Sequence, residues 1–176
     1  MKKQMIALAL GTAVVGATPV IALAQQAAPA QESKPRRIET TVFDSWTVTC
    51  GENEAGKKNC NAVLRVIDNE SGNVVLVWLV AKDANNKLAS AMQTPTGIQL
   101  ANGVSLKLGA AAARKLAYVN CMPNHCEAVA PLDAAFLKEI NAATEASATI
   151  TLVDGRTAEF KFPLKGATEA IKLING

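Results

Sequence analysis

Two of the chain's four cysteines and its only histidine lie close together, in the segment Cys121-Met122-Pro123-Asn124-His125-Cys126. These residue types allow three kinds of chemistry: a reactive thiol pair, a zinc site with thiolate and imidazole ligands, or a structural disulfide. The other two cysteines, Cys50 and Cys60, lie far upstream. The spacing of all four decides which chemistry the sequence favours.

The cysteine spacing argues against redox and zinc sites. A thiol oxidoreductase typically has C-x-x-C at the start of a helix, whereas Cys121 and Cys126 form C-x₄-C between two predicted strands. Zinc sites usually have C-x₂₋₄-C in each half, and nine residues separate Cys50 from Cys60. Four cysteines permit three pairings, but each of these two pairs flanks a hairpin loop. We therefore predict disulfides Cys50–Cys60 and Cys121–Cys126.

His125 would have to act in any Ser-His-Asp or Cys-His mechanism, because the chain has no other histidine. It lies on a loop tip between Pro123 and a cysteine that we expect to be oxidised, so we interpret it as a solvated loop residue. Asp44 has no second carboxylate at a spacing that indicates acid–base catalysis. The sequence also contains no HExxH, GxSxG or phosphate-binding glycine loop. We predict no catalytic residue, cofactor or metal.

The segments that position these cysteines are predicted strands. Alternating apolar residues predict one strand over 42–50, a second over 60–67, and shorter ones around 88–92, 98–108, 116–121, 126–130, 148–152 and 158–162. The run 74–81 is apolar at every position, so we expect a central strand covered on both faces. Trp46 and Trp78 are predicted core residues. Short strands at this spacing predict a β-sandwich.

Two helices are expected within this β-rich chain. Asp133 can cap the first, whose apolar residues recur at helical spacing: Ala134, Phe136, Leu137, Ile140 and Ala143. A short helix or turn over 167–174 closes the chain. The fold class is therefore mainly β, with one inserted helix and a short C-terminal helix.

The first 24 residues are typical of a secretory signal peptide. Lys2 and Lys3 precede an apolar, alanine-rich run that ends in Ala22-Leu23-Ala24, so we expect cleavage after Ala24. Residues 25–39 are rich in Gln, Ala, Pro and charge and indicate a flexible leader, which leaves 40–176 as a single domain. We expect no transmembrane segment in the mature chain.

The charge balance argues against nucleic acid as a partner. Removal of Lys2 and Lys3 with the signal peptide leaves 16 basic against 15 acidic residues. A protein that binds a phosphate backbone usually has a concentrated basic face, and the one basic cluster lies at 34–37 in the leader.

Several motifs in the same order resemble the invasion-associated locus B family of Gram-negative bacteria, from about Phe43 to the end of the chain. They are Phe43-Asp44-x-Trp46-x-Val48-x-Cys50, Cys60, Thr94-Pro95-x-Gly97-Ile98-x-Leu100-x-x-Gly103-Val104-x-Leu106, Leu116-x-Tyr118-x-x-Cys121, Cys126-x-Ala128, Leu132-Asp133, Leu164-x-Gly166 and Ala170-Ile171-x-x-Ile174. The chain has His125 where the family tends to have Gly, and Ala167 where it tends to have an aromatic residue.

This resemblance implies an immunoglobulin-like β-sandwich, export to the periplasm or outer surface, and no known catalytic residues. In blood-borne pathogens the family is associated with entry into host cells, chiefly erythrocytes. The expectation is an exported, non-enzymatic binding or interaction protein, acting in host-cell interaction or envelope function. Its partner would be a protein or a cell-envelope component. The alternative is a periplasmic chaperone-like or redox protein. The sequence determines neither the partner nor the oligomeric state.

Overall fold

The computed structural model describes residues 37–52 and 56–176. The predicted signal peptide, and the leader up to residue 36, lie outside the described residues. The strands are β1 (Ile38–Phe43), β2 (Trp46–Glu52), β3 (Lys58–Ile67), β4 (Val74–Lys82), β5 (Leu88–Thr94), β6 (Val104–Leu108), β7 (Arg114–Cys121), β8 (Cys126–Pro131), β9 (Glu145–Thr151) and β10 (Thr157–Pro163). The helices are α1 (Ala134–Ala142), α2 (Ala167–Asn175) and a short 3₁₀ turn, η1 (Leu100–Asn102).

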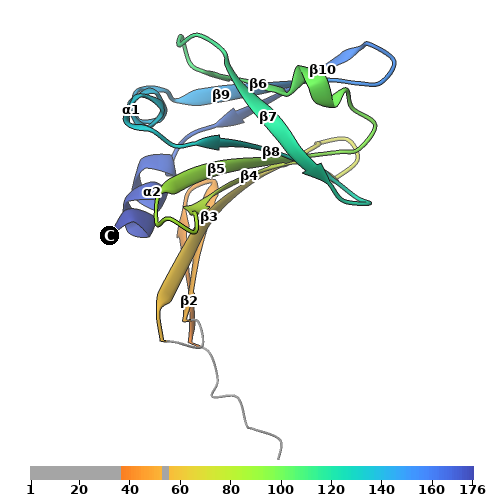
Figure 1. The fold of residues 1–176 in the computed structure, drawn as a ribbon. Coiled ribbons are helices and arrows are strands. Elements are labelled where there is room, and N and C mark those ends of the chain that lie inside the picture. Colours follow the sequence, from red (N-terminus) through yellow and green to blue (C-terminus); the bar gives the residue numbers. More distant parts are fainter. Residues whose placement is uncertain (1–36, 53–55) are drawn as a thin grey trace, which may run out of the picture. The chain divides into compact units, whose positions relative to one another are not determined.

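All ten strands join one antiparallel sheet in the order β1-β2-β3-β4-β5-β8-β7-β6-β9-β10. The sheet curls at β7, whose first part pairs with β6 and whose last part pairs with β8, so β7 crosses between two layers (Figure 1). The mainly β fold with an inserted and a C-terminal helix is confirmed. The immunoglobulin-like detail is not, because the strands form one continuous curled sheet.

The core lies on the inner face of this curled sheet. Trp46 and Trp78 are fully buried, as predicted, and their rings meet edge to face at 5.3 Å between centroids. Phe136 of α1 stacks on Trp78 at 6.4 Å, and Phe162 of β10 approaches it edge-on at 5.9 Å. The indole Nε1 of Trp78 donates to Ser90 Oγ at 2.7 Å. Strands from both layers and the inserted helix therefore pack on one aromatic cluster.

The chain reverses where a single strand over 42–50 was predicted. Asp44 has φ 49, in the left-handed region that Asp tolerates better than most residues, and the chain turns between β1 and β2. Val42 would share the buried side of Trp46 in one continuous strand, but it is 66% exposed on β1. The prediction of one continuous strand is wrong because alternation continues through the turn and conceals it. β1 also begins at Ile38, inside the segment expected to be leader.

The prediction that strand β4 is covered on both faces is wrong for its outer face. Leu76, Trp78 and Val80 are buried on the inner face. The alternate residues Val75, Val77 and Leu79 are only half-buried. Both helices contribute their buried residues to the inner core, so neither one covers these side chains. The apolar run 74–81 thus reflects one packed face and one partly open face.

The two helices lie where the sequence predicts them. Asp133 caps α1 by accepting the Phe136 backbone N–H at 2.7 Å. Helix α2 begins after Gly166 and buries Ala170, Ile171 and Ile174. Neither helix of the described residues is long and apolar enough to cross a membrane.

Candidate functional site

The first cysteine pair joins the two strands of a long hairpin close to its loop. Cys50 of β2 and Cys60 of β3 are direct cross-strand partners, 4.0 Å apart between Cα atoms, and form a disulfide. Cys50 is buried in the core and Cys60 is half-buried. The bond therefore holds β2 and β3 together close to the loop of the hairpin, with Cys50 buried in the core.

The second pair closes the β7–β8 hairpin. Cys121 and Cys126 are again direct partners, 4.0 Å apart between Cα atoms, and form a disulfide. The intervening turn is closed by the Met122 N–H, which donates to the His125 carbonyl oxygen at 2.7 Å. These are the two pairs that the hairpin spacing predicts. All four cysteines are bonded, so the structure holds no free thiol for a redox step.

His125 lies on this turn, where its ring contacts the side chain beside it. Its Nδ1 is 2.9 Å from Asn124 Oδ1, the side chain next to it in the chain. Across residues 37–52 and 56–176, no group of three or more His, Cys, Asp or Glu side chains is arranged to hold a metal ion. The structure gives His125 a polar contact within its own turn.

The two disulfides lie at opposite ends of the strands. The register aligns Asn61, beside Cys60, with Ala81, Ala89 and Pro131, at one end of β3, β4, β5 and β8. Cys126 pairs with Thr94 at the other end. The structure therefore has two separately fixed ends and no single cysteine-rich surface.

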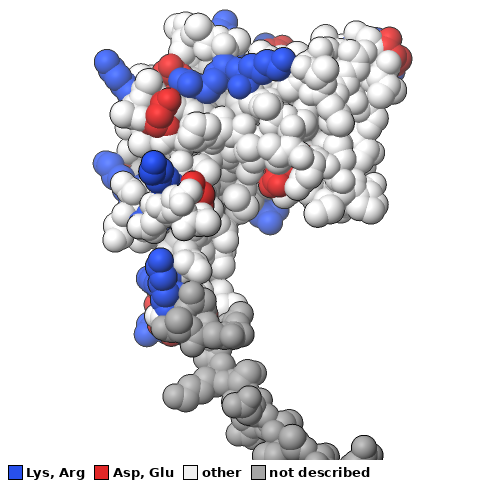
Figure 2. All heavy atoms as spheres, viewed as in Figure 1, with Lys and Arg blue, Asp and Glu red and all other residues white. Residues whose placement is uncertain are grey.

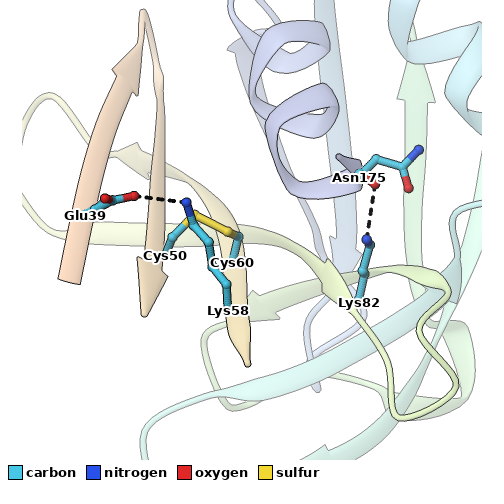
Figure 3. The surroundings of a disulfide bond; sticks show 6 residues. All are labelled: Glu39, Cys50, Lys58, Cys60, Lys82 and Asn175. Atoms are coloured by element: carbon cyan, nitrogen blue, oxygen red, sulfur yellow. Dashed lines mark hydrogen bonds and ion pairs between the residues drawn. A yellow bond between two sulfur atoms is a disulfide. The ribbon is translucent and has the colours of Figure 1, made fainter. Parts of the chain in front are cut away.

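A broad groove of about 1000 Å³ lies beside the Cys50–Cys60 disulfide. It is lined by the start of β3, the end of β4, the β4–β5 turn and the last residues of α2. Figure 3 shows Lys58 next to the disulfide and Lys82 next to the end of α2. The groove thus lies between the loop-side end of the β2–β3 hairpin and the last residues of α2, and a disulfide fixes one wall.

The groove walls carry ammonium groups from separate elements: Lys58 on β3, Lys82 on β4 and Lys172 on α2. Lys58 Nζ pairs with Glu39 Oε2 at 2.9 Å. The hydrogen bond from Lys58, the charge of Lys58 and that of Arg37 lower the pKa of Glu39. Lys82 Nζ donates to the Asn175 carbonyl oxygen at 3.2 Å, at the negative end of the helix dipole.

The acid in the groove wall, Asp83, is already engaged. Its Oδ1 accepts the backbone N–H groups of Asn85 at 2.8 Å and Lys87 at 2.9 Å. These bonds hold the β4–β5 turn but leave the negative charge of the carboxylate in place. The side chains that line the groove nevertheless include four lysines and only this one aspartate. The groove is therefore chemically suited to a ligand with negative charge.

Sequence reasoning did not identify these lysines. Lys58, Lys82 and Lys172 lie far apart in the chain, and no motif links them. Only strand pairing and the docking of α2 bring them to one groove. Elsewhere, basic and acidic side chains are interspersed on the side seen in Figure 2, which offers no continuous basic face among the described residues.

Three comparisons with known proteins point to the same family. A family model described as invasion associated locus B (IalB) protein matches residues 46–175. Two proteins of Brucella abortus, strains 2308 and 9-941, each named an invasion protein B homolog, are 29% identical over 135 residues, covering 75% of this chain and 76% of theirs. The crystal structure of invasion associated protein B from Bartonella henselae has a TM-score of 0.68 at 20% identity, covering 77% of this chain and 94% of that one.

Proposed function

Since the chain belongs to the invasion-associated locus B family, we propose that it is an exported, non-enzymatic binding protein that acts at the cell envelope or on host cells. The names of these relatives refer to invasion, which supports the host-cell part of the proposal. The predicted signal peptide and the two disulfides support export, because disulfides persist in oxidising compartments such as the periplasm.

The observation that carries the binding role is the lysine-lined groove. It is concave, it is formed by three elements, and the Cys50–Cys60 disulfide limits the movement of one wall. A pre-formed wall reduces the conformational entropy lost on binding. The ligand best suited to these ammonium groups is an acidic segment of a protein or envelope component.

The proposal is tested by complementing a deletion strain of the bacterium that encodes the chain. The wild-type gene should restore host-cell entry or envelope resistance, and the triple variant Lys58→Ala/Lys82→Ala/Lys172→Ala should not. The matched control is Lys87→Ala/Lys107→Ala/Lys138→Ala, three exposed lysines whose ammonium groups form no hydrogen bond or ion pair with another described residue. Full activity of the groove variant would remove the groove from the proposal. A deletion without either phenotype would remove the function itself.

A chaperone-like role is the second candidate, and the edge strand β1 favours it. Its first five residues are exposed, including Ile38 at 68% and Val42 at 66%. An open edge with apolar side chains can add an extended segment as a further strand. Suppression of aggregation of a denatured client, lost in Val42→Lys but kept in the groove variant, would support this role over the first.

A further inference from the structure

The outer face of the sheet carries a row that crosses seven strands and is apolar at six of its seven positions. The register places its members directly opposite one another in the order Val42, Thr47, Val63, Leu79, Ala91, Val129 and Ala117. We call this the outer row. Ala117 is exposed, Val129 is 36% exposed and Leu79 is half-buried. An antiparallel sheet with one solvated face usually has polar residues there, so the composition of this row is unusual.

The next row along the strands carries two opposite charges that lie three strands apart. Arg65, Val77, Gln93 and Glu127 are successive cross-strand partners on β3, β4, β5 and β8. Three strand intervals separate Arg65 from Glu127, roughly 14 Å at the usual strand spacing, which is too far for an ion pair within one molecule. Neither side chain makes a hydrogen bond or ion pair with another described residue.

We propose that this outer face binds a second copy of the chain, sheet against sheet. The two-fold axis would lie between the two sheets, parallel to the strands and midway between β4 and β5. Such an axis brings β3 of one copy onto β8 of the other. It therefore places Arg65 opposite the partner subunit's Glu127, and Glu127 opposite the partner subunit's Arg65. An isologous interface forms both ion pairs at once.

The same axis also brings side chains of complementary size together across the outer row. Leu79 meets the partner subunit's Ala91, and Val63 meets the partner subunit's Val129, so the largest side chain at the centre faces the smallest. Packed sheets lie about 10 Å apart, a gap that paired Arg and Glu side chains can span. A second copy accounts for both the apolar row and the spacing of Arg65 and Glu127, because each copy supplies the charge that the other lacks. This dimer does not depend on the lysine-lined groove, so the two proposals can fail separately.

The test measures self-association of the mature exported protein by sedimentation velocity over a range of concentrations. We expect a concentration-dependent dimer for the wild type. Leu79→Lys should be monomeric, because it places an ammonium group at the centre of the interface. Arg65→Glu and Glu127→Arg should each weaken the dimer about ten-fold or more, and the double variant Arg65→Glu/Glu127→Arg should restore it.

The control is Lys107→Glu on β6, an exposed charge reversal outside the outer face, which should leave the dimer unchanged. Circular dichroism and thermal unfolding confirm that each variant is folded. Three results would overturn the proposal: a wild type that is monomeric at every concentration, a dimer that persists in Leu79→Lys, or a double reversal that fails to restore association. A monomeric wild type would mean that the outer face binds a different partner or none. A dimer that persists in Leu79→Lys, or that the double reversal does not restore, would mean that the copies meet through another surface.

Discussion

Gly166 shows how one residue fixes the start of the C-terminal helix. Its φ is +87, in the region that favours glycine, and it precedes the first residue of α2. A Cβ at this position would overlap the carbonyl oxygen of Phe43 at the end of β1. Gly166 is one of the residues that carry the resemblance to the family. The structure explains why a glycine is needed there, because two backbone segments approach each other closely.

We predict that Gly166→Ala destabilises the domain far more than the same change at Gly155. Both glycines have φ +87, but a Cβ at Gly155 has no heavy atom within 4 Å. Gly155→Ala should cost about 1–2 kcal/mol from the left-handed backbone alone. Gly166→Ala should cost roughly 1–3 kcal/mol more, because backbone must move. Urea unfolding of both variants measures the difference, and equal losses would contradict the predicted overlap.

Tyr118 is the chain's only tyrosine, so its ionisation can be followed directly. Burial raises the pKa of Tyr118 above its ordinary value of 10.0, and the hydrogen bond with Thr94, 3.0 Å between oxygens, partly opposes that rise. The folded state thus favours the neutral phenol. The contribution of Tyr118 to stability is fully present below the pKa of the unfolded state, and it is lost as pH rises through the pKa of the folded state.

We predict that the phenolate absorbance at 295 nm appears above pH 10.0 in the folded protein and near pH 10 in the urea-unfolded chain. Thr94→Val should move the folded midpoint higher still, because it removes a hydrogen bond that stabilises the phenolate. A folded midpoint equal to the unfolded one would mean that Tyr118 is solvated.

At the scale of elements, each disulfide acts within one hairpin. The bonds join residues that are 10 and 5 positions apart, so each closes a short loop in the unfolded chain. Loop entropy gives about 3 kcal/mol for Cys50–Cys60 and about 2 kcal/mol for Cys121–Cys126. Since the bonds lie at opposite ends of the strands, they do not share neighbours.

We predict that Cys50→Ala/Cys60→Ala and Cys121→Ala/Cys126→Ala each lower the free energy of unfolding by about 2–3 kcal/mol. Their effects should add in the quadruple variant to within about 0.5 kcal/mol, because distant sites are independent. Guanidinium unfolding under non-reducing conditions measures all three. A quadruple loss well below the sum would show that the two hairpins are coupled.

At the scale of the whole molecule, the export proposal predicts a defined mature chain. Cleavage after Ala24 leaves Gln25 at the N-terminus and all four cysteines within the product. Intact-mass spectrometry of the exported protein, unreduced and treated with an alkylating reagent, should give the mass of residues 25–176 with two disulfides and no alkylation. Protein found at full length, or alkylated at any cysteine, would refute this prediction.

The sequence by itself determined the features that depend on neighbouring residues. Alternating apolar positions identified most strands, Asp133 and its apolar stripe identified α1, and short loops identified the cysteine pairs. The same local signal was ambiguous at Asp44, where alternation continued through a turn that depends on one left-handed residue. Local patterns are reliable because turns, caps and hairpin register are set within a few residues.

Only the tertiary structure decided how distant strands meet. The pairing of β5 with β8 and of β6 with β9 assembles the curled sheet, and the docking of α2 brings Lys172 to the groove shared with Lys58 and Lys82. The outer row likewise exists only after seven strands have aligned. These features follow from the register between strands that lie far apart in the chain. Burial of the common core fixes that register, and no periodic pattern in the sequence encodes it.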